Sequence, residues 1–178
     1  MVFSVYSVIS VAKKVIKMQT LIFGAGNLLC SDEGFGVHFI QYLEKHYVFQ
    51  DDVELYDGGT LGIMVTHLLE EADRVFLIDV VDVPGEPGDI FRYEKEEFLL
   101  GKLPIKMSPH QIGIQEVLTL SELRGRIPEQ VSLFGIIPQS YEAGVELSPL
   151  LAAKLPGLAE LVVGELRSVG HEIVKRAA

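Results

Sequence analysis

Three residues of this chain, Glu33, Asp79 and His110, carry side chains that can bind a metal ion and stand where predicted strands end or predicted helices begin. Glu33 opens a helix after a glycine-containing loop, Asp79 ends a short apolar segment, and His110 follows Pro109. Two carboxylates and one imidazole suit a borderline divalent ion such as zinc or nickel. Open coordination positions on that ion would leave room for a substrate group. The residue types therefore predict a cation site that could support chemistry.

Each of these acids, and two neighbouring residues, also has an ordinary structural explanation. Acidic residues in the first turn of a helix often act as caps. Asp57 ends another predicted strand before two glycines, and a turn residue that binds its own backbone is an equally good interpretation of it. Cys30 is the only cysteine, which excludes an intrachain disulfide and a cysteine zinc cluster. Without a base nearby in the sequence, Cys30 is expected to be a small buried hydrophobe.

The loop that should position Glu33 runs from a strand through a glycine turn into a helix. Gly24 and Gly26 allow a tight turn or a close approach. Asp32 is a good N-cap, and Glu33 suits the positive end of the helix dipole. A dinucleotide-binding α/β protein is one alternative, but its fingerprint needs a third glycine where this chain has Leu29. Acidic residues around a phosphate site would also repel the ligand, so a cation is favoured.

Alternating apolar strands and amphipathic helices predict the fold class. The order strand–helix–strand–helix–strand at the start indicates a parallel sheet covered by helices. The segment at 89–93 is an expected antiparallel edge strand, because the loop before it is too short for a helix. We expect a three-layer α-β-α sandwich around a mainly parallel five-stranded twisted sheet. The predicted strands are 19–23, 53–56, 75–78, 89–93 and 131–137, and the predicted helices are 32–47, 61–71, 111–123, 148–154 and 158–169.

Composition limits the partners and the organisation of the chain. The 178 residues carry a formal charge of −10, which argues against nucleic acid or an anionic membrane as a partner. We expect a cytoplasmic protein with one domain over 18–178. Residues 1–17 contain an uncharged run followed by lysines, too short for a membrane span and in the wrong order for a secretory signal. We interpret them as an N-terminal extension, with Met18 as a possible start.

Seven short motifs, taken in order, resemble those of the hydrogenase maturation proteases over about residues 19 to 169. Each motif is weak alone, and the ordered set is specific. The motifs are Gly24-Ala-Gly-Asn27, Asp32-Glu33 with Gly36-Val37, Asp57-Gly-Gly-Thr60, Leu77-Ile-Asp79, Ser108-Pro-His-Gln111, Gly135-Ile-Ile-Pro138 and Leu147-Ser-Pro149.

The resemblance implies a function and a role for each matching residue. Members of that family are endopeptidases that remove a C-terminal tail from the large-subunit precursor of a nickel–iron hydrogenase after nickel insertion. Glu33, Asp79 and His110 match the family's metal-contacting residues, and Asp57 matches a motif acid whose role stays open. The nickel is expected to come with the substrate, without an organic cofactor, and the enzyme to be a monomer.

A carboxylate, or a water molecule polarised near the metal, would assist the hydrolysis, and the sequence does not identify the nucleophile. Both an aspartyl-type and a metal-dependent endopeptidase therefore stay open. A non-catalytic, nickel-dependent chaperone that holds the precursor is the other alternative.

Overall fold

A five-stranded sheet forms the centre of the protein in the computed structural model, which describes residues 18–60, 65–99 and 111–177. The strand order is β3-β1-β4-β6-β5. The first four strands run parallel, and β5 pairs with β6 in the antiparallel direction. The predicted sheet and its antiparallel edge are therefore confirmed. The strands are β1 (Thr20–Ala25), β3 (Val53–Gly59), β4 (Arg74–Val80), β5 (Ile90–Glu94) and β6 (Gln130–Ile136).

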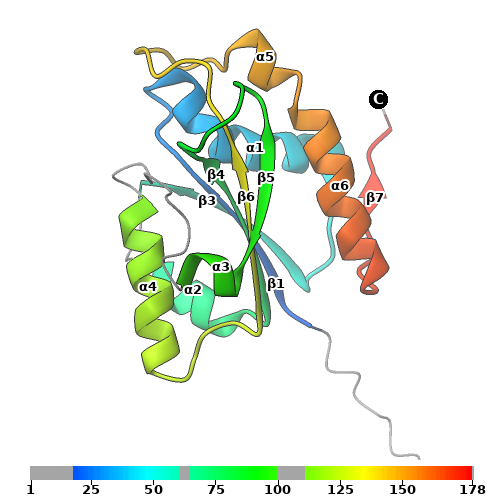
Figure 1. Cartoon of the computed structure of the whole chain (residues 1–178). Helices are drawn as coiled ribbons and strands as arrows, with labels where there is room; N and C mark the ends of the chain where they lie inside the picture. The colour runs from blue at the N-terminus through cyan, green and yellow to red at the C-terminus, as the bar shows by residue number, and fades with distance from the viewer. Residues whose placement is uncertain (1–17, 61–64, 100–110, 178) are drawn as a thin grey trace, which may run out of the picture.

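Helices cover both faces of this sheet, as Figure 1 shows, so the three-layer architecture is also confirmed. Leu21, Phe23 and Ala25 of β1 belong to one buried cluster, whereas Ile22 between them belongs to another. This alternation is the two-residue period of a strand buried on both sides. On the Ile22 side lie α1 (Phe35–His46), α5 (Pro149–Ala152) and α6 (Leu155–Ser168); on the other side lie α2 (Thr66–Glu71) and α4 (Gln111–Leu123), with the short α3 (Lys95–Leu99) following β5.

Several boundaries differ from the predicted ones for local physical reasons. The last long helix begins at Leu155, earlier than predicted, because Pro156 stands in its first turn, where proline needs no hydrogen-bonded N–H. The strand β3 continues to Gly59, so Asp57 lies inside it. A second sheet of two short antiparallel strands, β2 (Tyr47–Val48) and β7 (Val174–Lys175), was not predicted.

Two glycines allow α1 to start directly on the sheet. A Cβ at Gly24 would lie 2.1 Å from the carbonyl oxygen of Gly36, and a Cβ at Gly36 would lie 2.3 Å from those of Ala25 and Ile78. The start of α1 therefore touches the ends of β1 and β4, which brings the preceding turn, η1 (Ser31–Gly34), to the carboxyl edge of the sheet.

Three predictions fall wholly or partly outside the described part of the chain. The helix predicted at 61–71 is described only from residue 65, and there α2 covers Thr66–Glu71. The proposed extension at 1–17 and the histidine at 110 are not among the described residues. Within the described ranges, no helix has the length and apolar character needed to cross a membrane.

Candidate active site

Glu33 and Asp79 lie at the same edge of the sheet, on different elements. Glu33 is in η1 and 8% exposed, and Asp79 is near the end of β4 and 2% exposed. The segment 26–30 between β1 and η1, which we call the glycine loop, folds back on the turn. Gly26, with φ of +144°, allows this, and a Cβ there would lie 2.1 Å from the carbonyl oxygen of Glu33. Asn27 N–H donates to that oxygen at 3.2 Å. The loop therefore holds the turn that carries Glu33 against the ends of β1 and β4.

Tyr141 connects the two acids electrostatically. Burial raises the pKa of its phenol, and the negative charges of Asp82, Glu33 and Asp79 raise it further, in that order. Its hydroxyl group therefore lies within electrostatic reach of carboxylates from both η1 and β4 and stays protonated at neutral pH. Tyr141 could not be recognised from the sequence, because it stands in a polar loop with no spacing signal that links it to either acid.

The predicted trio is only partly described. Among the described residues, no group of three or more His, Cys, Asp or Glu side chains is placed to hold a metal ion. Because His110 is not described, the assignment of Glu33, Asp79 and His110 as catalytic and metal-contacting residues stays a prediction. The structure adds that the two carboxylates share one edge and one tyrosine.

Asp57 has the local role of a turn residue. It pairs in register with Gly24 of β1, and its side chain is exposed. Its Oδ1 accepts a hydrogen bond from the N–H of Gly59, two residues on, at 3.0 Å. This contact is the one that the turn interpretation predicts.

Cys30 was expected to be buried and apolar, and it is instead partly exposed with polar neighbours. Asn27 Nδ2 donates to its Sγ at 3.3 Å. Burial raises the pKa of the thiol, and a hydrogen bond with Glu33 and the charge of that carboxylate raise it further. A thiol with a raised pKa is a poor nucleophile, so Cys30 is not suited to covalent catalysis.

Asp32 is not an N-cap, which corrects the prediction. Cys30 and Gly34 occupy the cap positions of η1 and α1, and neither makes a side-chain cap hydrogen bond. The Asp32 carboxylate is instead fully buried. Its Oδ2 accepts from the backbone N–H of Gln139 (2.9 Å) and Ser140 (3.0 Å), and its Oδ1 from that of Ser148 (2.7 Å). The carboxylate therefore fixes both ends of the segment 139–148, which we call the clamped loop.

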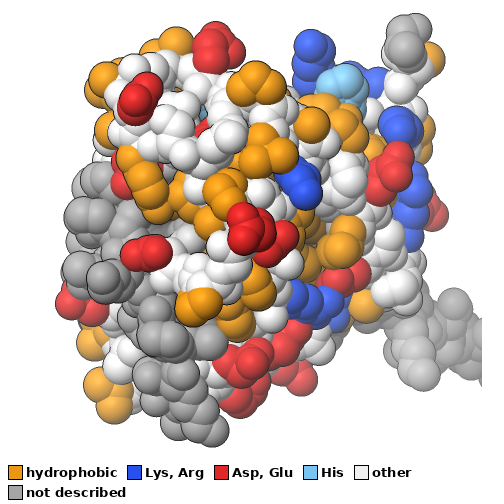
Figure 2. Space-filling view, turned by 45° about the horizontal axis from the view of Figure 1, so that its top comes forward, with side chains coloured by type: hydrophobic (Ala, Val, Ile, Leu, Met, Phe, Trp, Pro, Cys, Tyr) orange, Lys and Arg blue, Asp and Glu red, His pale blue; other side chains and the backbone are white. Residues whose placement is uncertain are grey.

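Backbone contacts attach the middle of the clamped loop to the glycine loop. Ser31 N–H donates to the carbonyl oxygen of Gly144 at 2.8 Å, and Gly144 N–H donates to that of Leu29 at 3.0 Å. Ser31 Oγ donates to the carbonyl oxygen of Glu146 at 3.1 Å, and Ser31 itself has φ of +48°, a strained value for a residue other than glycine. His38 Nε2 lies 3.1 Å from the carbonyl oxygen of Val145. Figure 2, which brings these upper loops forward, shows acidic side chains beside apolar ones on this face.

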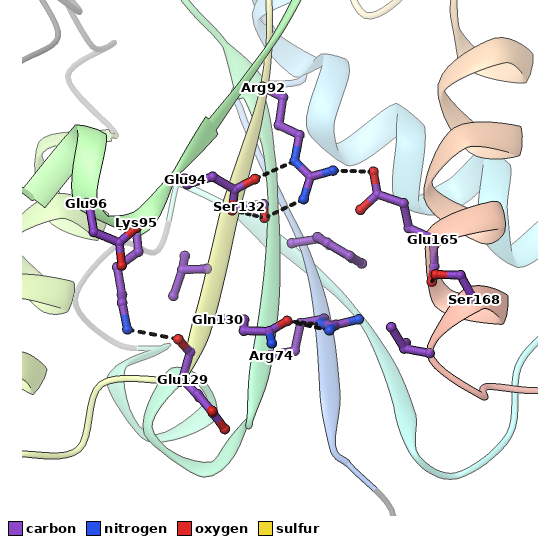
Figure 3. Close-up of a pocket in the computed structure, with 13 residues that line it drawn as sticks. Arg74, Arg92, Glu94, Lys95, Glu96, Glu129, Gln130, Ser132, Glu165 and Ser168 are labelled. Carbon is purple, nitrogen blue, oxygen red and sulfur yellow. Dashed lines mark hydrogen bonds and ion pairs between the residues drawn. The ribbon is translucent and has the colours of Figure 1, made fainter.

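A cavity of about 450 Å³ lies apart from this edge. It lies between α6 and the starts of β4 and β6, and Figure 3 shows its side chains. Arg92 occupies its wall and pairs with Glu94 at 2.6 Å and Glu165 at 2.5 Å. Its lining contains no His, Cys or Asp side chain. Both of its arginines, Arg74 and Arg92, already have side-chain partners, and its lining offers no imidazole or thiol.

Comparisons with known proteins agree with the fold and show the family. A family profile described as hydrogenase maturation protease (HycI) matches residues 37–165. The hydrogenase 2 maturation protease of Escherichia coli K12 is 34% identical over 162 residues, which cover 90% of this chain and 98% of that protein. The hydrogenase expression/formation protein HoxM of Cupriavidus necator is 40% identical over 159 residues, 87% and 77% of the two chains.

Solved structures of hydrogenase maturation peptidases have a similar fold. The hydrogenase maturating endopeptidase HybD from E. coli superposes with a TM-score of 0.83 at 34% identity, over 89% of this chain and 98% of that one. A hydrogenase 2 maturation peptidase from a Thaumarchaeota archaeon has a TM-score of 0.63 at 30% identity, over 86% and 99%. The chain therefore belongs to the hydrogenase maturation protease family and is an endopeptidase, a hydrolase of peptide bonds.

Proposed function

We propose that this endopeptidase removes the C-terminal tail of a nickel–iron hydrogenase large-subunit precursor after nickel has been inserted. The observation that carries the proposal is the meeting of two buried carboxylates, Glu33 and Asp79, at one sheet edge in a chain of this family. The names of the relatives, among them a hydrogenase 2 maturation protease, support the identity of the substrate.

Nickel enters this proposal as part of the substrate. Buried carboxylates are unfavourable unless a positive charge or hydrogen bonds compensate them. Asp79 Oδ1 accepts a hydrogen bond from the N–H of Val80 at 2.7 Å. A divalent ion held by the precursor would be attracted to the two negative charges, and Glu33, Asp79 and His110 would contact it. These contacts would place the scissile bond of the tail at the carboxyl edge of the sheet, so that cleavage depends on a loaded precursor.

For the hydrolysis itself, the described residues offer carboxylates and not a thiolate. The two carboxylates at this edge can activate a water molecule, and we propose that water is the nucleophile. One of the two carboxylates would accept the proton of that water molecule, a role that requires a hydrogen-bond distance in the complex with substrate.

We further propose that the enzyme acts as a monomer in the cytoplasm. The single cysteine requires no oxidising compartment, and the formal charge of −10 favours separate molecules over self-association. Light scattering of the purified protein tests the first statement, and fractionation of the producing cells tests the second.

Co-expression with an uncleaved large subunit tests the function. We expect the wild-type enzyme to convert the precursor to a faster-migrating form on denaturing gels, and Glu33→Gln, Asp79→Asn and His110→Ala to leave it uncleaved. Asp89→Asn is the matched control, since this exposed acid lies outside the site.

Normal processing by Glu33→Gln or His110→Ala would show the site assignment to be wrong. A precursor that binds the wild-type enzyme but keeps its length would indicate a holding chaperone instead of a protease.

A further inference from the structure

Three large apolar side chains are exposed on the two loops that are hydrogen-bonded to each other beside η1. Leu29 is 68% exposed, Tyr141 55% and Val145 57%. Leu29 belongs to the glycine loop, and the other two belong to the clamped loop. The hydrogen bonds that join Gly144 to Leu29 and Ser31 bring these segments together. We call the surface formed by Leu29, Tyr141, Gly144 and Val145 the shelf.

The shelf is rigid as well as apolar. A fully buried carboxylate and several backbone hydrogen bonds fix the clamped loop on the turn that carries Glu33. An exposed loop that only connects β6 to α5 would not need this number of long-range contacts. Apolar side chains held in place at the surface mark interaction sites, and a preorganised surface binds with a smaller loss of conformational entropy.

Gly144 has no internal reason to be glycine. Its φ is not in the left-handed region, and no atom lies within 4 Å of the position that a Cβ would take. A side chain there would point into open space on the shelf. The absence of a side chain leaves room for another backbone to pass close to the clamped loop.

Tyr141 adds a polar group to the shelf, because its side chain is 55% exposed on the clamped loop. A tyrosine phenol is protonated at neutral pH. A protonated phenol can donate a hydrogen bond to a peptide carbonyl oxygen, which carboxylates cannot do. The acidic surroundings favour a neutral or basic peptide over an acidic one.

We propose that the shelf is the docking surface for the extended C-terminal tail of the precursor, with the tail's apolar side chains on Leu29 and Val145 and a tail carbonyl accepting from Tyr141. This inference rests on the proposed function, because it is the tail that must lie beside Glu33 and Asp79. Continuity between the shelf and η1 places an occupant of the shelf next to these acids. Tyr141 and Gly144 are then positioning residues for the substrate.

Steady-state cleavage of purified nickel-loaded precursor tests the shelf. We expect Tyr141→Phe to raise KM about threefold to tenfold, the range for one lost hydrogen bond, with a smaller change in kcat. Gly144→Ala should raise KM at least as much, since its methyl group occupies the space of the tail backbone. Both variants should have the Tm of the wild type. The side chain of Tyr141 is 55% exposed, and a Cβ at Gly144 would meet no atom within 4 Å.

The chain offers matched controls for each variant. A Cβ at Gly164 on α6 also meets no atom within 4 Å, so Gly164→Ala makes the same change away from the shelf. Leu123 is 82% exposed on α4, so Leu123→Ser matches Leu29→Ser. We expect only Leu29→Ser of this pair to raise KM.

The outcomes separate this inference from the proposed function. Wild-type KM for both Gly144→Ala and Tyr141→Phe, in an enzyme that cleaves the precursor, would overturn the shelf and leave the function intact. If the wild-type enzyme cleaves nothing but binds the precursor, and Gly144→Ala weakens that binding, the protease function fails and the shelf stands. Equal binding by wild type and Gly144→Ala would overturn the shelf in that case too.

Discussion

Replacing Asp32 is expected to destabilise the clamped loop strongly, because this one buried carboxylate accepts three backbone hydrogen bonds. The donors are Gln139, Ser140 and Ser148, at 2.9, 3.0 and 2.7 Å. Asp32→Ala removes all three acceptor contacts at once. It therefore releases both ends of the clamped loop without touching Glu33 or Asp79.

The size of the effect follows from the number and kind of bonds. A hydrogen bond to a charged group contributes about 1.5–3 kcal/mol, so three would give at most roughly 9 kcal/mol. Water can reach the released N–H groups of this part-buried loop, so we expect Asp32→Ala to lower the free energy of unfolding by about 3–5 kcal/mol. At about 2–4 °C of Tm per kcal/mol for a chain of this size, Tm should fall by roughly 10 °C.

Asp32→Asn should cost less. Its one remaining carbonyl oxygen can still accept from Gln139 and Ser140, while its NH₂ group then faces the N–H of Ser148, so one bond becomes a contact between two donors. We expect about 2–3 kcal/mol of destabilisation for this variant.

Urea unfolding and amide hydrogen exchange measure these effects. The amides of Gln139, Ser140 and Ser148 should lose protection in Asp32→Ala, and cleavage of the precursor should slow because the shelf is no longer held. The control is Asp89→Ala, an exposed acid that accepts one backbone N–H from Glu86 at 2.9 Å and should cost less than about 1 kcal/mol. If Asp32→Ala is no more destabilising than Asp89→Ala and the three amides stay protected, the clamp is not what fixes this loop.

Three further predictions follow from contacts already described. Because the Glu33 charge helps to raise the pKa of the Cys30 thiol, Glu33→Gln should increase the thiolate fraction at pH 8 and speed iodoacetamide alkylation by about twofold to tenfold, measured by mass spectrometry. Gly36→Ala places a Cβ 2.3 Å from two carbonyl oxygens and should lower the free energy of unfolding by about 3 kcal/mol or more in urea titration. Arg92→Met should cost no more than about 1 kcal/mol, because its partners are partly exposed, and should leave precursor cleavage unchanged.

Each of these predictions has a result that would contradict it. Slower alkylation in Glu33→Gln would mean that the carboxylate does not hold the thiol in its protonated form. Gly164→Ala is the control for Gly36→Ala, and equal stability of the two variants would show that α1 does not press on the sheet. Loss of cleavage in Arg92→Met would move the reaction to the large cavity.

The fold could be predicted because its signals are local. The alternation of Leu21, Ile22 and Phe23 between two buried clusters is visible in the sequence as a continuous apolar run. The short loop before β5 leaves no room for a crossover helix, which is why the antiparallel edge was predicted correctly. The pairing of β2 with β7 could not be predicted, because two residues show no periodicity and their partners, such as Tyr47 and Lys175, are far apart in the chain.

Only the part of the site that lies at the ends of the parallel strands could be predicted from the sequence. Glu33 and Asp79 were expected near each other because parallel strands end at the same edge, and Gly24 pairing with Ile78 agrees with this. The role of Asp32 depends on N–H groups more than a hundred residues away in the sequence. The N-cap prediction considered only residues next to Asp32 in the chain, and it was therefore wrong. Tyr141 is brought to the acids by that same long-range clamp.

A second group of polar residues is arranged like a catalytic triad. We expect it to stabilise the fold and not to take part in catalysis. His171 Nε2 lies 3.0 Å from Thr20 Oγ1, and His171 Nδ1 lies 2.6 Å from Asp52 Oδ2. Such hydroxyl–imidazole–carboxylate chains activate nucleophiles in many hydrolases. Here all three residues are buried at the start of β1, away from Glu33. The cavity that the hydroxyl-bearing Thr20 borders is about 140 Å³, below the roughly 300 Å³ at which ligand pockets usually begin. A cavity of about 360 Å³ is lined by Asp52, but neither Thr20 nor His171 is in its lining.

We therefore expect the Thr20–His171–Asp52 group to stabilise the fold by tying the segment after α6 to β1. Thr20→Val keeps the shape and the strand preference but removes the hydroxyl group, and should lower the free energy of unfolding by about 1–2 kcal/mol. Its cleavage of the precursor should match the wild type in kcat/KM, whereas Glu33→Gln should lose cleavage with little change in Tm. The reverse pattern, with Thr20→Val inactive and stable, would place the reaction at the amino edge of the sheet. The triad-like arrangement of side chains does not by itself show where the reaction takes place. Access of the substrate decides which of the two groups is catalytic.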